Sequence, residues 1–121
     1  MQKKRLEKYE SLIHGVLNQY LTIEGRGLLK NNFVTIMGVR VSSNLSLAKV
    51  YLSFLNEESQ NENFNMIEKN KKKIRGFLGN KIRHQARKIP EIKFILDTTE
   101  QKASKIEKII SELEIPKSNK K

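Results

Sequence analysis

Apolar residues near the start of the chain recur at alternating steps of three and four, which places their side chains on one face of a helix. The members of this series are Leu6, Tyr9, Ile13, Val16, Tyr20 and Ile23. Gly25 and Gly27 follow the series, and glycine is a poor helix former. The pattern therefore predicts a first helix that ends before these glycines.

Two extended segments follow this helix. Residues 33–42 are rich in β-branched side chains and predict a strand, with Gly38 as a candidate bulge. Residues 47–55 predict a second strand, because apolar and other side chains alternate along it. Its alternating apolar set is Ala48, Val50, Leu52 and Phe54. The short Ser42-Ser43-Asn44 link predicts that the two strands form a hairpin.

The second half of the chain predicts a long helical segment, a short strand and a last helix. Ile67, Ile74, Leu78 and Ile82 mark one helical face, in a segment expected to reach about residue 87 and to stop before Pro90. Residues 92–96 predict a third strand. The pair Thr98 and Gln101 has the spacing of a capping box, which predicts a helix with Ala103, Ile106, Ile110 and Leu113 facing inward. The order predicts an α+β fold of helices on a three-stranded sheet.

Two features qualify the long helical segment. Lys71 would point into the core if one helix ran unbroken from Ile67, so we expect a kink or break between Asn70 and Lys72.

Gly76-Phe-Leu-Gly79 has the G-x-x-G sequence of nucleic-acid clamps. Leu78, however, fits the apolar face, and clamp loops usually hold polar residues between the glycines. We therefore read this motif as helix interior.

Length and charge narrow the possible functions. The chain has 121 residues, which suits one domain, predicted over residues 1–115 with a basic, disordered tail at 116–121. Lysine and arginine outnumber acids 24 to 13, for a net charge of +11, which attracts polyanions. No apolar run is long enough to span a membrane, and no signal-peptide pattern opens the chain. We expect a cytoplasmic monomer that does not bind membranes.

Catalytic chemistry has little support in the sequence. The chain has no cysteine, and no spacing in the sequence joins His14 or His84 to a carboxylate and a nucleophile as catalysis would require. No phosphate-binding loop or dinucleotide motif occurs. We therefore expect no enzyme activity, no cofactor, no metal and no small-molecule substrate.

A stripe of positive charge opposes the apolar face of residues 69–88. Those residues contain no acid, whereas a solvated helix face usually mixes charge signs. Gly76 lies on the stripe and would let a phosphate backbone come close. The residues predicted to bind RNA are Lys69, Lys72, Lys73, Arg75, Lys81, Arg83, Arg87 and Lys88.

The chain resembles the ribosome-binding factor A family from Arg5 to Leu113. The resemblance is strongest in Val39-Arg-Val-Ser-Ser-Asn-Leu45 with Ala48-Lys-Val-Tyr-Leu-Ser53, and in Pro90-Glu-Ile-Lys-Phe-Ile-Leu-Asp97. Between these blocks lie Ile74-Arg75, Leu78-Gly79 and Ile82-Arg83. The resemblance implies a type II K-homology-like fold without the G-x-x-G clamp. The family's Ala-x-Gly kink corresponds here to Asn70, Lys71 and Lys72, so this sequence departs from that pattern.

The resemblance implies a factor that binds small-subunit ribosomal RNA in the free 30S subunit. Such factors assist maturation of the RNA near its 5′ end and leave before translation. Two binding alternatives remain open: a permanent ribosomal protein or general K-homology RNA binder, and an adaptor whose basic face docks an acidic protein. An enzyme that acts on RNA phosphates is a third alternative.

Overall fold

The computed structural model describes residues 2–29, 32–86 and 88–99. Its elements are α1 (Gln2–Leu28), β1 (Val34–Val41), β2 (Leu47–Phe54), α2 (Gln60–Lys69), α3 (Lys71–Ile82) and β3 (Glu91–Leu96). The α+β architecture is as expected, with helices on a three-stranded sheet. The expected last helix and the tail at 116–121 fall largely or wholly outside the described residues.

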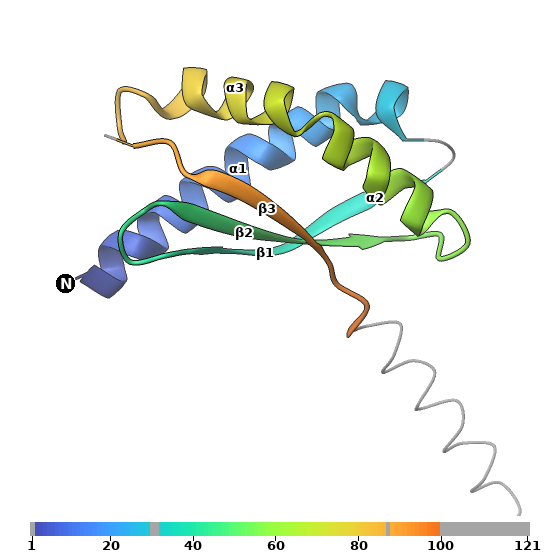
Figure 1. Ribbon diagram of the computed structural model, residues 1–121, viewed down its shortest axis with the longest axis horizontal. Helices are drawn as coiled ribbons and strands as arrows, with labels where there is room; N and C mark the ends of the chain where they lie inside the picture. Colours follow the sequence, from blue (N-terminus) through green and yellow to red (C-terminus); the bar gives the residue numbers. More distant parts are fainter. Residues whose placement is uncertain (1, 30–31, 87, 100–121) are drawn as a thin grey trace, which may run out of the picture.

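The sheet has the order β1-β2-β3 and is mixed. β1 and β2 form the expected antiparallel hairpin, and their register shifts between Ile36 and Gly38, which confirms the bulge. β3 pairs with β2 in parallel. A parallel neighbour requires a crossover connection, and α2 and α3 supply it. All three helices lie along one side of the sheet, and no described element covers the opposite side (Figure 1).

The core lies between the helices and the inner face of the sheet. The alternating set predicted in β2 is buried, with Ala48, Val50 and Leu52 each 0% exposed. The predicted apolar face of the helical segment is buried as well, in Ile67, Ile74, Leu78 and Ile82. These two patterns therefore identified the buried residues of β2 and of the crossover helices correctly.

The first helix differs from its prediction in both length and face. α1 continues through Gly25 and Gly27 to Leu28, and the Leu29 N–H still donates to the Gly25 carbonyl at 2.8 Å. Leu29 is only 8% exposed, and its burial offsets the poor helix propensity of the two glycines. The buried face also includes Leu17 and Leu21, which the prediction omitted. Ile23, predicted on that face, is 61% exposed.

Side chains of α1 reach the outer edge of β1. The Val41 N–H donates to the Glu10 carboxylate at 2.9 Å. Further along the strand, Nε2–H of His14 donates to the Ile36 carbonyl at 3.2 Å. Two backbone groups of this edge strand are thereby bonded to a helix of the same domain.

The predicted break in the helical segment occurs at Asn70, which separates α2 from α3. The Asn70 side-chain amide donates to the Met66 carbonyl at 2.8 Å, and its backbone N–H donates to the Ile67 carbonyl at 3.0 Å. These bonds satisfy carbonyl groups at the end of α2 that have no partner in the helix. Beyond the break, Lys71 pairs with Glu68 at 3.1 Å instead of entering the core. An asparagine and a lysine thus occupy the break, at positions where the resemblance implied small residues.

Candidate nucleic-acid interface

The exposed face of the crossover helices carries most of the cations predicted to bind RNA. Lys69 ends α2, and Lys72, Lys73 and Lys81 lie on α3. Arg83 is the C-cap of α3, and Lys88 follows in the connection to β3. We call this set the basic helix surface; its members are Lys69, Lys72, Lys73, Lys81, Arg83 and Lys88, and all are exposed.

One part of the predicted stripe has a different geometry. The helix was expected to reach about residue 87, but α3 ends at Ile82, so the stripe cannot continue as helix beyond the cap at Arg83. The connection to Pro90 begins here, and Gln85 is exposed. Arg87 lies outside the described residues.

A hollow of about 370 Å³ opens beside Lys72 of the basic helix surface. Its lining residues are Lys72, Arg75, Gly76, Gly79 and Ile89. Lys72, Gly76 and Gly79 share one side of α3 at 100° per residue, and Arg83 follows about one turn after Gly79, at the C-cap. Gly76 is exposed, and a Cβ added there would meet no atom within 4 Å, so a phosphate backbone could come close to the helix at this residue, as the sequence had suggested. At Gly79, by contrast, the Ile89 side chain lies 3.7 Å from the position of an added Cβ.

The G-x-x-G motif is part of α3 and not of a loop between helices. Leu78 is 0% exposed, and Phe77 packs edge-on against Tyr20 with ring centroids 5.2 Å apart. The two residues between the glycines therefore belong to the core and its margin. This agrees with the interpretation of the motif as helix interior.

Arg75 is held by the connection that leads into β3. Its Nε donates to the Pro90 carbonyl at 3.0 Å and its Nη2 to the Ile89 carbonyl at 2.8 Å. Nη1 lies 3.5 Å from the Glu91 carboxylate. Two of its donors thus bond to backbone carbonyl groups. Arg75 lines the hollow and also links α3 to the segment that leads into β3.

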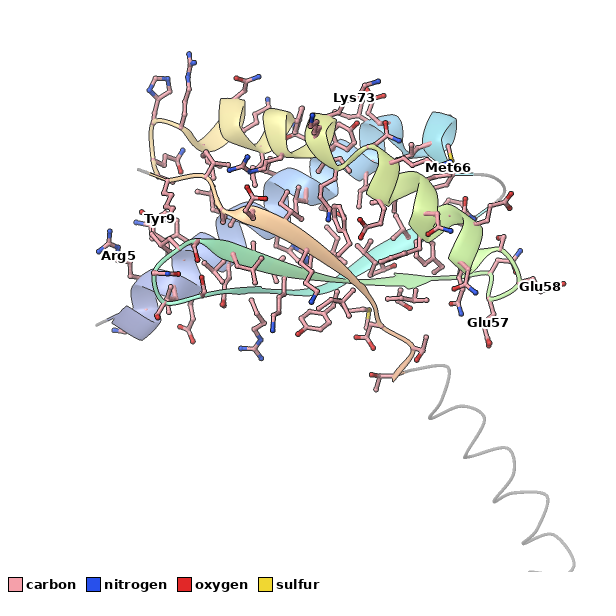
Figure 2. The ribbon with its side chains drawn as sticks, viewed as in Figure 1. Arg5, Tyr9, Glu57, Glu58, Met66 and Lys73 are labelled. Carbon is pink, nitrogen blue, oxygen red and sulfur yellow. The ribbon has the colours of Figure 1, made fainter. Side chains whose placement is uncertain are left out.

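The charge on the layer of helices is unevenly distributed. Glu57 and Glu58 lie at the end where α2 begins, whereas Lys73 lies on α3 (Figure 2). Glu62 also lies in the first turn of α2. A polyanion is therefore attracted to α3 and repelled from the start of α2, which gives its approach a direction.

Other kinds of site find no support in the described residues. Those residues contain no group of three or more His, Asp or Glu that could hold a metal ion. No helix in the described part of the chain is long and apolar enough to cross a bilayer.

The order of elements, the break between α2 and α3, and the parallel β3 define a K-homology-like domain. The family model for ribosome-binding factor A matches residues 5–110. The chain belongs to the ribosome-binding factor A family.

Relatives and solved structures agree with this assignment. Ribosome-binding factor A of Cytophaga hutchinsonii is 38% identical over 97% of this chain and 88% of its own length. The Chlorobium phaeobacteroides protein of the same name is 36% identical over 90% of this chain and 93% of its own.

The crystal structure of ribosome-binding factor A from Thermus thermophilus has a TM-score of 0.62 at 18% identity. The match covers 75% of this chain and 94% of that one. A Thermotoga maritima ribosome-binding factor A, solved in solution, has a TM-score of 0.60 at 32% identity, over 75% of this chain and 85% of that one.

Proposed function

We propose that this protein is a non-catalytic assembly factor that binds the RNA of the free small ribosomal subunit and assists maturation of that RNA near its 5′ end. Family membership supports the ribosome as partner. The observation that best supports RNA contact is the hollow on α3, which Lys72, Gly76 and Gly79 line, on a helix whose C-cap is Arg83.

The physical mechanism needs only binding. Lysine and arginine side chains neutralise phosphates, and the exposed Gly76 lets the RNA backbone lie close to the helix. These groups read the path of the backbone more than the bases, so recognition depends on RNA shape. A ligand shifts an equilibrium by its differential affinity for two states. The factor would therefore favour one fold of the unfinished RNA and leave when that fold is no longer accessible.

Sedimentation of a cell lysate tests the biological part of the proposal. The protein should accompany free small subunits and their precursors and be scarce on translating ribosomes. Equal abundance on translating ribosomes would instead support a permanent ribosomal protein.

Charge reversal tests the surface. Lys72→Glu with Arg83→Glu reverses the charge of two members of the basic helix surface, one of which lines the hollow, and leaves the buried residues of α3 unchanged. The contribution of this surface to RNA binding should be lost while the thermal melt stays cooperative. Lys120→Glu with Lys121→Glu lowers the net charge equally without changing any residue of this surface, and should weaken binding only slightly. Equal losses would mean that binding follows net charge alone.

A further inference from the structure

The side of the sheet that faces away from the helices has its own ordered pattern of side chains. Burial alternates along β2 and β3, so Lys49 and Tyr51 on β2 and Lys93 and Ile95 on β3 point away from the core. On β1, Arg40 is exposed between the buried Val39 and Val41. No described element covers this face (Figure 1).

Three cations on this face form one row across all three strands. The register pairs Arg40 with Lys49 and Lys49 with Lys93. We call Arg40, Lys49 and Lys93 the cross-strand cation row. Neighbouring strands are only about 4.8 Å apart, and like charges directly opposite each other destabilise a sheet. No carboxylate among the described residues forms an ion pair with any of the three. The row therefore lacks a described counter-charge and is suited to an external anion.

The next outward row is apolar and contains an aromatic ring. Tyr51 pairs with Ile95 on one side and with Gly38 on the other, beside the bulge at Met37. Tyr51 is half-buried and Met37 is 42% exposed. Successive outward rows are about 6.6 Å apart along a strand, a distance that a nucleotide can span between its phosphate and its base. Phosphate on the cations with a base on the ring is the usual chemistry of single-strand binding.

We propose that this outer face is a second binding surface, for single-stranded RNA, centred on Tyr51 and the cross-strand cation row. This inference rests on the proposed function and extends it. The basic helix surface and the outer face lie on opposite sides of the sheet, so the domain holds two RNA segments at once. It acts as a spacer that fixes two parts of a ribosomal RNA relative to each other.

Substitutions on the outer face separate binding from folding. Tyr51→Ala should weaken affinity for a short single-stranded oligonucleotide by roughly 5- to 150-fold, the usual value of one base stacked on an aromatic ring. Tyr51→Phe keeps the ring and should retain affinity. Lys49→Gln with Lys93→Gln should lower the slope of log affinity against log salt by about 1.4. The same pair removes like-charge repulsion, so its melting temperature should hold or rise.

Holding two segments is tested with two oligonucleotides, one carrying a donor dye and the other an acceptor dye. With the full chain, energy transfer between them should appear. It should disappear for Tyr51→Ala and for Lys72→Glu with Arg83→Glu. Energy transfer that never appears with the wild type would overturn simultaneous binding.

The failures of the two proposals are distinguishable. Unchanged RNA affinity in Tyr51→Ala and in the Lys49, Lys93 pair would overturn the second surface, leaving the face for an acidic protein or for residues 100–121 of this chain. Failure of the wild-type protein to bind RNA and small subunits would overturn the proposed function itself.

Discussion

Gly76 offers a sharp test of the hollow on α3, because its replacement should affect folding and binding in opposite directions. A Cβ added at Gly76 meets no atom within 4 Å, so alanine fits without strain. In an exposed helix interior, alanine is favoured over glycine by about 0.8–1.0 kcal/mol. Gly76→Ala should therefore raise the free energy of unfolding by about that amount and the melting temperature by roughly 3–7 °C.

RNA binding should weaken in the same variant. The added methyl group fills part of the hollow that Lys72, Gly76 and Gly79 line. If it displaces one phosphate from the helix, one charge-assisted hydrogen bond is lost, about 1.5–3 kcal/mol. That loss corresponds to an increase in Kd of roughly 10- to 150-fold. Fluorescence anisotropy with a single-stranded oligonucleotide at fixed ionic strength measures it.

Gly15 provides the matched control. It is exposed in α1, outside the hollow, and a Cβ added there also meets nothing within 4 Å. Gly15→Ala should stabilise the fold as Gly76→Ala does and leave RNA affinity unchanged. If both variants are stabilised and neither loses affinity, the RNA backbone does not approach Gly76 and the reasoning is refuted.

Three further predictions concern neighbouring features. Arg75→Ala should lower the free energy of unfolding by roughly 1–3 kcal/mol in a denaturant titration, because two hydrogen bonds to backbone are lost. As a control, Lys72→Ala should change the free energy of unfolding by no more than about 0.5 kcal/mol. An Arg75→Ala variant that is stable but fails to bind RNA would show that Arg75 is an RNA ligand instead. Asn70→Ala should cost about 1 kcal/mol through the lost bond to Met66, and a variant more stable than wild type would contradict that account of the helix break. If the basic helix surface engages about five phosphates, log affinity should fall with log salt at a slope near −3.5, and a flat response would exclude this surface.

The sequence predicted best where burial depends on local periodicity. The alternation in β2 and the face formed by Ile74, Leu78 and Ile82 were correct, because each pattern has the period of its own element. The break at Asn70 was found from Lys71, since a charge aimed at the core is costly enough to indicate a change of direction. Most of the fold could therefore be predicted from local sequence patterns.

Predictions that depended on distant partners were wrong or incomplete. Gly25 and Gly27 do not end α1, because the burial of Leu29 stabilises the last turn of the helix. That burial depends on distant parts of the chain, which a local pattern does not reveal. Arg75 remains predicted to bind RNA, but its charge did not indicate that it also bonds to carbonyl groups 14 and 15 residues further along the chain. The cross-strand cation row depends on strand register, which single residues such as Arg40 do not reveal.

The contacts that α1 makes with β1 also bear on self-association. An edge strand with free N–H and C=O groups can recruit a strand from another molecule and begin aggregation. Here the Glu10 carboxylate bonds to the Val41 N–H and the His14 ring to the Ile36 carbonyl along that edge. The bulge between Ile36 and Gly38 also interrupts the regular ladder of the strand. A second copy would have to detach α1 before its strand could add. The edge is thus protected by its own first helix, and a crowded, concentrated solution should leave β1 closed to further strands.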